Sequence, residues 1–333
     1  MLNDLEDCKL CSWQCGVDRL AGEYGVCLKG FPEVASCQLH PAPPQSYTVF
    51  TAGCNLRCLN CQNWDIAHYP VTRVPIKGKV DPKIIAQEGV KAIHSMFGQL
   101  IRADRLFFSG GAPTVSLPWI EEVISHTHSL DPEIKVNFDT NGFPSKESFQ
   151  RILAISDSVT FDLKAFNDDV HRALTGAPVE PVLKNAETMA QHAKKLWEYR
   201  ILVIPSIVDI EEIRQICEFI AGLNETLPVC FLAFRPNFCL DSHPGAPQTL
   251  MEQCLSIAKK AGLENSHWAG QADLKGKNLE LPHAAYQKIK HEGAHVAMAY
   301  ASRAGCTMQL RNCGQCRSHL QCRVKGYVPS RTT

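Results

Sequence analysis

The sequence lacks an excess of charge of either sign, because 34 lysines and arginines balance 34 aspartates and glutamates among its 333 residues. DNA- and RNA-binding domains usually carry a basic surface, so no nucleic-acid partner is expected. The sequence also lacks a run of 18 apolar residues, and the segment Met1–Asp7, with its three acidic groups, does not have the pattern of a signal peptide. We therefore expect a cytoplasmic protein with no membrane partner.

The central cysteine motif lacks a fourth cysteine. Cys54, Cys58 and Cys61 follow one another with the spacing C-x3-C-x2-C. A [4Fe–4S] cluster normally takes four thiolate ligands. A motif with three leaves one iron open for an outside ligand, as a catalytic zinc site keeps one position open. The alternative interpretations are a structural zinc site and an incomplete four-ligand site.

Sixteen cysteines would indicate disulfides in a small secreted domain, but this chain is neither small nor visibly secreted. Twelve of the sixteen lie within the first 61 and the last 30 residues, which favours metal binding over free thiols. Each terminal group of four can hold a mononuclear iron, a zinc or an auxiliary [4Fe–4S] cluster, and ligand number does not separate these. The N-terminal cysteine set is Cys8, Cys11, Cys15 and Cys27, and the C-terminal cysteine set is Cys306, Cys313, Cys316 and Cys322.

The remaining cysteines and two histidines have weaker patterns. Cys217, Cys230, Cys239 and Cys254 stand singly in helix or strand patterns and are predicted to be buried and inert. His243 lies in a segment that faintly resembles a cobalamin-binding motif, although an incidental loop histidine is the simpler interpretation. His267 is predicted either to pack in the core or to line a pocket.

Strand and helix patterns alternate from Tyr47 to Phe234, and six strand–helix repeats imply a parallel sheet with right-handed crossovers. The predicted fold is α/β, a half-open (β/α)6 barrel over residues 46–270, with a cysteine-rich metal-binding segment at 1–45 and a C-terminal extension at 271–333. One predicted helix covers Pro82–Phe97, with Ile84, Ile85, Val90, Ile93 and Phe97 facing inward, and another covers Ile210–Ala221. The predicted strands are Tyr47–Thr51, Arg105–Phe108, Ile134–Phe138, Ser158–Leu163, Tyr199–Ile204 and Val229–Phe234.

Polar or glycine-rich segments follow successive predicted strands. The carboxyl ends of parallel strands form one rim, which is where active sites lie in such folds. A single glycine pair or Asp-x-Lys would indicate only a turn or a surface ion pair. Here each such segment lies at or directly after the end of a predicted strand, and this regular position favours one shared site. The segments are the cysteine motif, Ser109–Thr114, Asp139–Gly142, Asp162–Lys164, Pro205–Ser206 and Phe234–Asn237.

With these motifs, residues 46–268 resemble the radical S-adenosylmethionine (SAM) core of the pyruvate formate-lyase activating enzyme family. The chain resembles a branch with an N-terminal Cys-x2-Cys-x3-Cys…Gly-x2-Gly-x-Cys segment, which here reads Cys8 to Gly16 and then Gly22 to Cys27. The segment His267–Gly270 resembles the closing strand of the family. The spacing of these motifs is specific to that family. The last ~60 residues lie outside the resemblance.

The resemblance implies roles for individual residues. Cys54, Cys58 and Cys61 hold the cluster, and at Gly110 and Gly111 the backbone approaches the amino group of SAM, where a side chain would block it. Arg200 meets SAM or its ribose. The chain departs from the family at Asn60, where an aromatic residue is usual, and at Ala112, where an acidic residue often stands. Asp139, Asn141, Asp162 and Lys164 line the SAM and substrate cavity, the last two as candidate catalytic residues.

The resemblance also implies an oxygen-sensitive enzyme. A flavodoxin- or ferredoxin-type donor reduces the cluster, SAM is cleaved to methionine and a 5′-deoxyadenosyl radical, and the radical abstracts hydrogen from a protein or peptide, as in glycyl-radical activases. The alternative is a cobalamin-dependent radical SAM protein C-methyltransferase, for example one acting on methyl-coenzyme M reductase of a methanogen. Small-molecule chemistry and a non-catalytic iron–sulfur electron carrier are the remaining alternatives.

Overall fold

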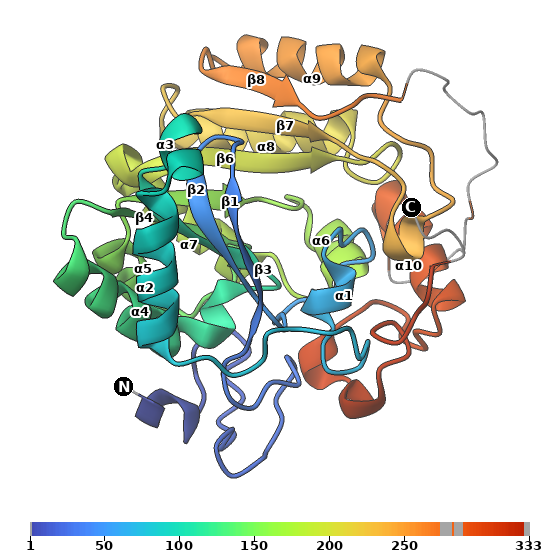
Figure 1. Cartoon of the computed structure of the whole chain (residues 1–333). Helices are drawn as coiled ribbons and strands as arrows, with labels where there is room; N and C mark the ends of the chain where they lie inside the picture. Colours follow the sequence, from blue (N-terminus) through green and yellow to red (C-terminus); the bar gives the residue numbers. More distant parts are fainter. Residues whose placement is uncertain (1, 274–281, 283–288, 330–333) are drawn as a thin grey trace. The chain divides into compact units, whose positions relative to one another are not determined.

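The computed structural model describes residues 2–273, 282 and 289–329 (Figure 1). It divides into two compact units: the first contains Met1–Asn55 and Asn63–Thr160, and the second contains Leu56–Gln62 and Phe161–Thr333. Within the predicted C-terminal extension, residues 274–281, 283–288 and 330–333 lie outside the described residues. The predicted division at residues 45 and 270 stays a prediction.

The first unit is built on strands that are neighbours both in sequence and in the sheet. β1 (Val34–His40) pairs antiparallel with β2 (Ser46–Thr51), and β2, β3 (Arg105–Gly110) and β4 (Lys135–Thr140) pair in parallel. The Asn137 side chain of β4 bonds Ser158 and Thr160, which open β5 (Ser158–Asp162). Helix α2 lies against α4 (Figure 1). The helices of this unit are η1 (Leu2–Leu5), α1 (Trp64–Ala67), α2 (Pro82–Ile93), α3 (Met96–Leu100), η2 (Pro113–Ser116), α4 (Leu117–Leu130) and α5 (Lys146–Ile155).

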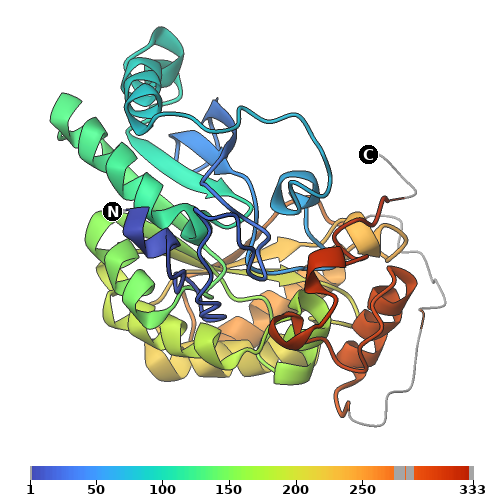
Figure 2. The same cartoon turned by 90° about the horizontal axis from the view of Figure 1, so that it is seen from below.

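The second unit continues the pattern with β6 (Leu196–Val203), β7 (Val229–Ala233) and β8 (Ser266–Ala269), which pair in parallel. Helix α8 lies against α9, and α10 lies against α6. The segment after α10, red in Figure 2, folds back beside that helix, where Cys306 N–H donates to the Ala301 carbonyl at 2.9 Å. The helices are α6 (Asp168–Thr175), α7 (Glu180–Gln191), η3 (Ala193–Lys195), α8 (Ile210–Leu223), η4 (Phe238–Leu240), α9 (Gln248–Lys260), α10 (Glu292–Arg303), η5 (Cys313–Gln315) and η6 (His319–Gln321).

The predicted α/β class is confirmed, because the described strands follow the order β1 to β8 in a mostly parallel sheet with helices between them. Parallel strands are covered on both faces and therefore appear as continuous apolar runs. Val49, Leu106, Phe108, Val136 and Phe138 are fully buried on the strands of the first unit. None of the described helices combines the length and apolar character needed to span a bilayer.

The predicted helix over Pro82–Phe97 is confirmed as far as Ile93 and is wrong in its last four residues. Helix α2 ends at Ile93, and the Ser95 side chain then accepts from Gly98 N–H at 3.1 Å, which caps the separate helix α3. The new helix changes the direction of its side chains, so Phe97, predicted to face inward, is 64% exposed. Ile84, in the first turn of α2, is 48% exposed and also contradicts the predicted inward face.

Candidate active site

In the first unit, the backbone that follows β2 passes directly against the backbone that follows β3. Gly111 N–H donates to the Thr51 carbonyl, and Ala112 N–H donates to the Gly53 carbonyl, both at 2.9 Å. A Cβ added at Gly111 would lie 2.1 Å from the Gly53 oxygen. Gly110 has φ of +109°, and a Cβ there would lie 2.6 Å from the Thr51 nitrogen. Both positions therefore require glycine for steric reasons within the fold, apart from any ligand.

We expect Gly111→Ala to lower the free energy of unfolding by about 1–3 kcal/mol, since backbone atoms must move to admit the new methyl group. The matched control is Gly222→Ala in α8, where an added Cβ meets nothing within 4 Å. Alanine is favoured over glycine in helices, so the control should be neutral or slightly stabilised. Denaturant unfolding of both variants under anaerobic conditions measures the difference. Equal stability of the two variants would contradict the steric argument.

Asp139 and Asn141, which end β4 and open the following loop, lie at the predicted rim within the first unit. The Ser109 hydroxyl donates to the Asp139 carboxylate at 2.7 Å. The Asn141 amide donates to the side-chain oxygen of Asn55 at 2.7 Å, and its nitrogen lies 4.0 Å from Cys54 Sγ. These contacts place Asn141 beside the first cysteine of the central motif.

In the second unit, Cys58 lies near two cationic side chains, those of Lys164 and Arg311. Burial raises the pKa of the Cys58 thiol, and the charges of Lys164 and Arg311 oppose that rise. Lys164 pairs with Asp162 at 3.0 Å. Burial lowers the pKa of Lys164, but Asp162 and the sulfurs of Cys58 and Cys61 together raise it above its ordinary value. Lys164 is therefore protonated at neutral pH and favours the thiolate form of Cys58.

Arg200 lies on β6, where its Nε and Nη2 donate to one oxygen of Glu198 at 3.0 and 2.8 Å. Its role toward SAM stays a prediction. The four single cysteines are buried as predicted: Cys217, Cys230, Cys239 and Cys254.

The N-terminal cysteine set lines one cavity of the first unit, together with Trp13, Arg19 and Val115. Tight turns wrap this cavity, because Cys8 N–H donates to Val17 and Gly16 N–H returns to the Cys8 carbonyl, both at 3.1 Å. Burial raises the pKa of Cys11, and the nearby cysteines of the set raise it further. Arg19 Nη1 lies 3.7 Å from Cys8 Sγ. Convergence of four sulfurs on one cavity supports the prediction of a metal site there.

The same N-terminal segment is bonded to residues next to the central motif, still within the first unit. Trp13 Nε1–H donates to the Asn55 carbonyl at 2.8 Å, and the Trp13 and Phe143 rings lie 5.0 Å apart. Ser12 N–H donates to the Phe143 carbonyl at 3.1 Å. The N-terminal cysteine set is therefore fixed to the loop that follows Cys54.

The C-terminal cysteine set lies against the end of α6 in the second unit. Cys313 N–H donates to the Gly176 carbonyl at 2.8 Å, and a Cβ added at Gly176, whose φ is +84°, would lie 2.3 Å from Cys313 Sγ. Burial raises the pKa of Cys313, with Arg311 and Arg57 opposing and Cys322 and Cys306 adding to the rise. Cys316 N–H donates to the Cys313 carbonyl at 3.4 Å. Cys313 is thus close enough to Cys306 and Cys322 for their charges to affect its pKa, and its backbone is bonded to that of Cys316.

Arg311 connects this set to the central motif and was not predicted from the sequence. Its buried guanidinium donates to the carbonyls of Ala173 and Leu174, near the C-terminus of α6, at 2.9 Å, and also to the Arg57 carbonyl. The Leu174 carbonyl also accepts from Leu59 N–H at 2.9 Å. Arg57 Nη2 in turn donates to the His319 carbonyl at 2.9 Å. A basic residue in a cysteine-rich tail carries no pattern that would reveal this role.

The sequence comparisons decide the family. The model of the radical SAM superfamily matches residues 48–220, which is more than half of the chain. The chain belongs to the radical SAM superfamily. The predicted resemblance is thereby confirmed, and the protein is a radical SAM enzyme.

Several proteins are similar to this radical SAM enzyme. An uncharacterized protein of Methanocaldococcus jannaschii, MJ0808, is 24% identical over 308 residues, which cover 83% of this chain and 84% of that protein. The pyruvate formate-lyase-activating enzyme of Staphylococcus aureus is 26% identical over 189 residues, or 55% of this chain and 71% of that enzyme. Among solved structures, Streptococcus suis SuiB bound to S-adenosylmethionine aligns with a TM-score of 0.48 and 16% sequence identity. The alignment covers 65% of this chain and 48% of the SuiB chain.

Membership of this superfamily implies a [4Fe–4S] cluster and SAM, and the residues fit the cluster. Cys54, Cys58 and Cys61 offer three sulfur donors within one loop. Burial raises the pKa of Cys58, but the charges of Lys164 and Arg311 oppose that rise and so favour the thiolate that an iron ligand requires. The Asn141 amide lies beside the sulfur of Cys54, and polar groups in such positions influence the reduction potential of iron–sulfur clusters.

Anaerobically prepared enzyme is expected to hold more metal than one [4Fe–4S] cluster requires, because both terminal cysteine sets gather sulfur donors. Iron plus zinc, measured by elemental analysis, should exceed four atoms per chain. Cys8→Ser/Cys11→Ser should lower the metal content without removing the central cluster. A fully loaded wild-type protein with four irons and no zinc would contradict both accessory sites.

Proposed function

We propose that this radical SAM enzyme abstracts a hydrogen atom from a protein or peptide substrate and so modifies it after translation, as glycyl-radical activases do. The observation that carries the proposal is the central cysteine motif together with Lys164 beside Cys58 and Asn141 beside Cys54. Similarity to an activating enzyme of Staphylococcus aureus, whose name specifies pyruvate formate-lyase, supports a protein substrate.

When bound, the cluster and SAM supply reductive cleavage of a carbon–sulfur bond and a 5′-deoxyadenosyl radical. The side chains and backbone of the protein would bind and orient SAM and shield it from solvent. Lys164, protonated and paired with Asp162, offsets negative charge at Cys58 and provides a cation for an anionic group of SAM. Gly110 and Gly111 carry no side chain, so a bound SAM would be able to approach their backbone.

Protein C-methylation is the second candidate function, supported by accessory cysteine sets that a simple activase does not need. A flavodoxin- or ferredoxin-type donor serves either function. His243 does not support cobalamin binding at its segment. Its Nδ1 contacts the Tyr300 hydroxyl at 3.1 Å, its Nε2 contacts the Pro205 carbonyl at 2.8 Å, and the residue is 1% exposed. Any cobalamin would have to bind elsewhere.

The test follows hydrogen from the substrate. Cells of the source organism are grown in deuterated medium, and their extract is separated into protein and small-molecule fractions. Reduced enzyme and unlabelled SAM are then added to each fraction. We expect deuterium in 5′-deoxyadenosine only with the protein fraction. Deuterium transfer from the small-molecule fraction alone would overturn the proposal. A glycyl-radical signal in the acceptor protein indicates activation, whereas a gain of one methyl mass indicates methylation.

A further inference from the structure

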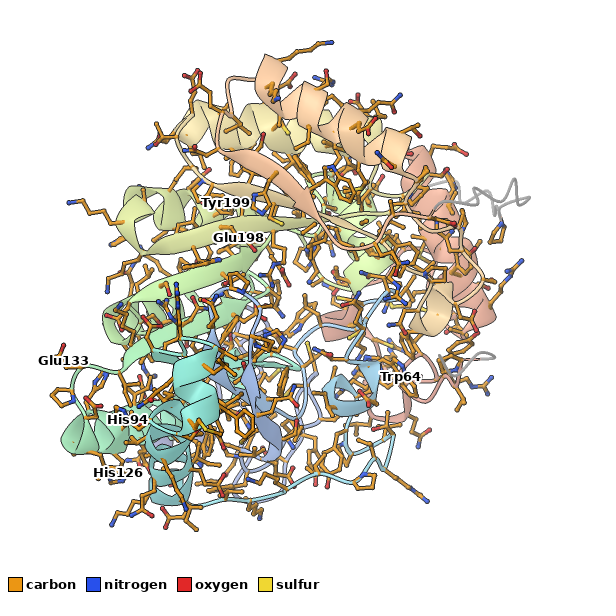
Figure 3. The ribbon with its side chains drawn as sticks, turned by 45° about the horizontal axis from the view of Figure 1, so that its top comes forward. Trp64, His94, His126, Glu133, Glu198 and Tyr199 are labelled. Atoms are coloured by element: carbon orange, nitrogen blue, oxygen red, sulfur yellow. The ribbon has the colours of Figure 1, made fainter. Side chains whose placement is uncertain are left out.

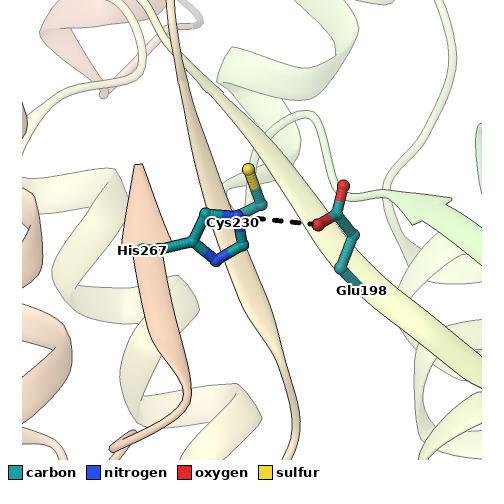
Figure 4. A group of neighbouring side chains, drawn as sticks. All are labelled: Glu198, Cys230 and His267. Carbon is teal, nitrogen blue, oxygen red and sulfur yellow. Dashed lines mark ion pairs between the residues drawn. The ribbon is translucent and has the colours of Figure 1, made fainter. Parts of the chain in front are cut away.

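We propose that Glu198, Cys230 and His267 bind one divalent metal ion of the zinc type, with one coordination position open to an outside ligand. This site lies wholly in the second unit and is separate from all three cysteine groups described above. Each ligand comes from a different strand, β6, β7 or β8. Their ligating atoms all lie within 4.8 Å of one another (Figure 4).

The strand register brings these side chains together. Cys230 pairs with Arg200 on one side and with His267 on the other. Glu198 is two residues before Arg200 and therefore shares its face of the sheet. Tyr199, between them, points away: it is fully buried, and its hydroxyl donates to the Ala186 carbonyl. Figure 3 labels Glu198 and Tyr199, which are consecutive on β6. Parallel pairing thus fixes three ligand types on one face without help from a loop.

Burial gives the site a closed side and an open side. Cys230 is 2% exposed, and the Glu198 side chain is 11% exposed, whereas the His267 side chain is 59% exposed. Zinc ligands at bond lengths of 2.0–2.3 Å lie about 3–4 Å from one another. The 3.9 Å between His267 Nε2 and Glu198 Oε2 already meets this spacing. The exposed imidazole can rotate to complete the approach and leaves room for a fourth ligand on its side.

Charge at the site allows a cation because the neighbouring arginine is already paired. Arg200 bonds Glu198 Oε1, and the Oε2 atom faces His267. Burial raises the pKa of the Cys230 thiol to about 12, with Glu198 adding to the rise and Arg200 opposing it. The metal must therefore displace the thiol proton, as metals do at cysteine sites.

The donor set selects the type of metal. A thiolate, an imidazole and a carboxylate suit Zn²⁺ or Fe²⁺, whereas Mg²⁺ and Ca²⁺ prefer oxygen ligands alone. Three protein ligands with a fourth position open is the arrangement of catalytic rather than structural zinc. Cys230 and His267 are each the second residue of their strand, near the amino end. Active sites of parallel barrels lie at the carboxyl ends of the strands. The proposed ligands nevertheless interact with two residues predicted to serve SAM, because Arg200 is bonded to Glu198 and the charge of Asp162 acts on Cys230.

The test is a Co²⁺ titration of the full-length enzyme after its iron sites have been loaded anaerobically. Wild type should take up one more Co²⁺ per chain than Cys230→Ser does, and this additional ion should contribute its own thiolate-to-cobalt charge-transfer band. Cys230→Ser should lose that band, and His267→Ala and Glu198→Gln should each weaken uptake at least about tenfold. The matched control is Cys254→Ser, another buried cysteine of the same unit, which should bind Co²⁺ as wild type does.

His267→Ala keeps the test decisive if Cys230→Ser does not fold, because the exposed His267 side chain contributes little to the core. Unchanged Co²⁺ uptake and spectra in His267→Ala and Glu198→Gln would overturn the proposal. Loss of Co²⁺ binding in Cys254→Ser as well would also overturn it, because the effect would then not be specific to these ligands.

Discussion

Cys58→Ala is expected to abolish formation of 5′-deoxyadenosine from SAM. A [4Fe–4S] cluster that keeps one iron open needs three cysteine thiolates, and the central motif offers three. Loss of Cys58 would leave two. At metal sites, loss of a residue that only hydrogen-bonds to a metal ligand already lowers affinity or activity about 10–100-fold. Loss of the ligand Cys58 itself should therefore lower the rate of 5′-deoxyadenosine formation more than about 100-fold. The measurement is chromatographic detection of 5′-deoxyadenosine with dithionite as reductant.

The control for this experiment is Cys217→Ala, which removes a buried thiol of α8 in the same unit. It should leave SAM cleavage near the wild-type rate. SAM cleavage retained in Cys58→Ala would refute the assignment of the cluster ligands, and equal loss in both variants would point to a general effect of cysteine removal.

The second large effect is expected in Cys313→Ala/Cys316→Ala, assayed both without and with the protein substrate. A structural metal contributes on the order of 10 kcal/mol of folding free energy, so the tail should unfold when its ligands are lost. Because unfolding of the tail also removes the contacts of Arg311 with the cluster loop, we expect abortive SAM cleavage to fall, but less than modified product, which should fall more than about tenfold. Product formed at the wild-type rate would show that the tail is dispensable and would favour the simple activase.

Arg311→Met separates the metal of the tail from its attachment. This variant keeps all four cysteines of the C-terminal set but removes the bonds to α6 and to the Arg57 carbonyl. It also removes a positive charge near Cys58, so the reduction potential of the central cluster should become more negative, as spectroscopic titration can measure. The matched control is Arg317→Met, an exposed arginine of the same tail. Equal potentials in the two variants would contradict the role of Arg311.

The sequence predicted the features that depend on local pattern. Central strands such as β3 and β4 carry buried aliphatic and aromatic residues that favour strand, and the cysteine spacing is complete within eight residues. Cysteine spacing also predicted the N-terminal set, whose four members line one cavity.

Features that depend on register or on distant contacts were not predicted. β1 was missed because strands were predicted only from Tyr47 to Phe234, although its residues 35–40 alternate between apolar and polar side chains. Cys230 was predicted to be an inert thiol because its proximity to Glu198 and His267 arises only from the pairing of three strands. The break between α2 and α3 depends on one serine cap, which competes with an apolar pattern that continues through it.

The bond between Arg311 and the Arg57 carbonyl has a consequence for how the enzyme matures in the cell. The two residues are 254 positions apart, so the ribosome completes the cluster loop long before the guanidinium that stabilises it exists. During that interval the Arg57 carbonyl must find water in place of the guanidinium. The cluster loop should therefore reach its final stability only after the segment that contains Arg311 has been synthesised.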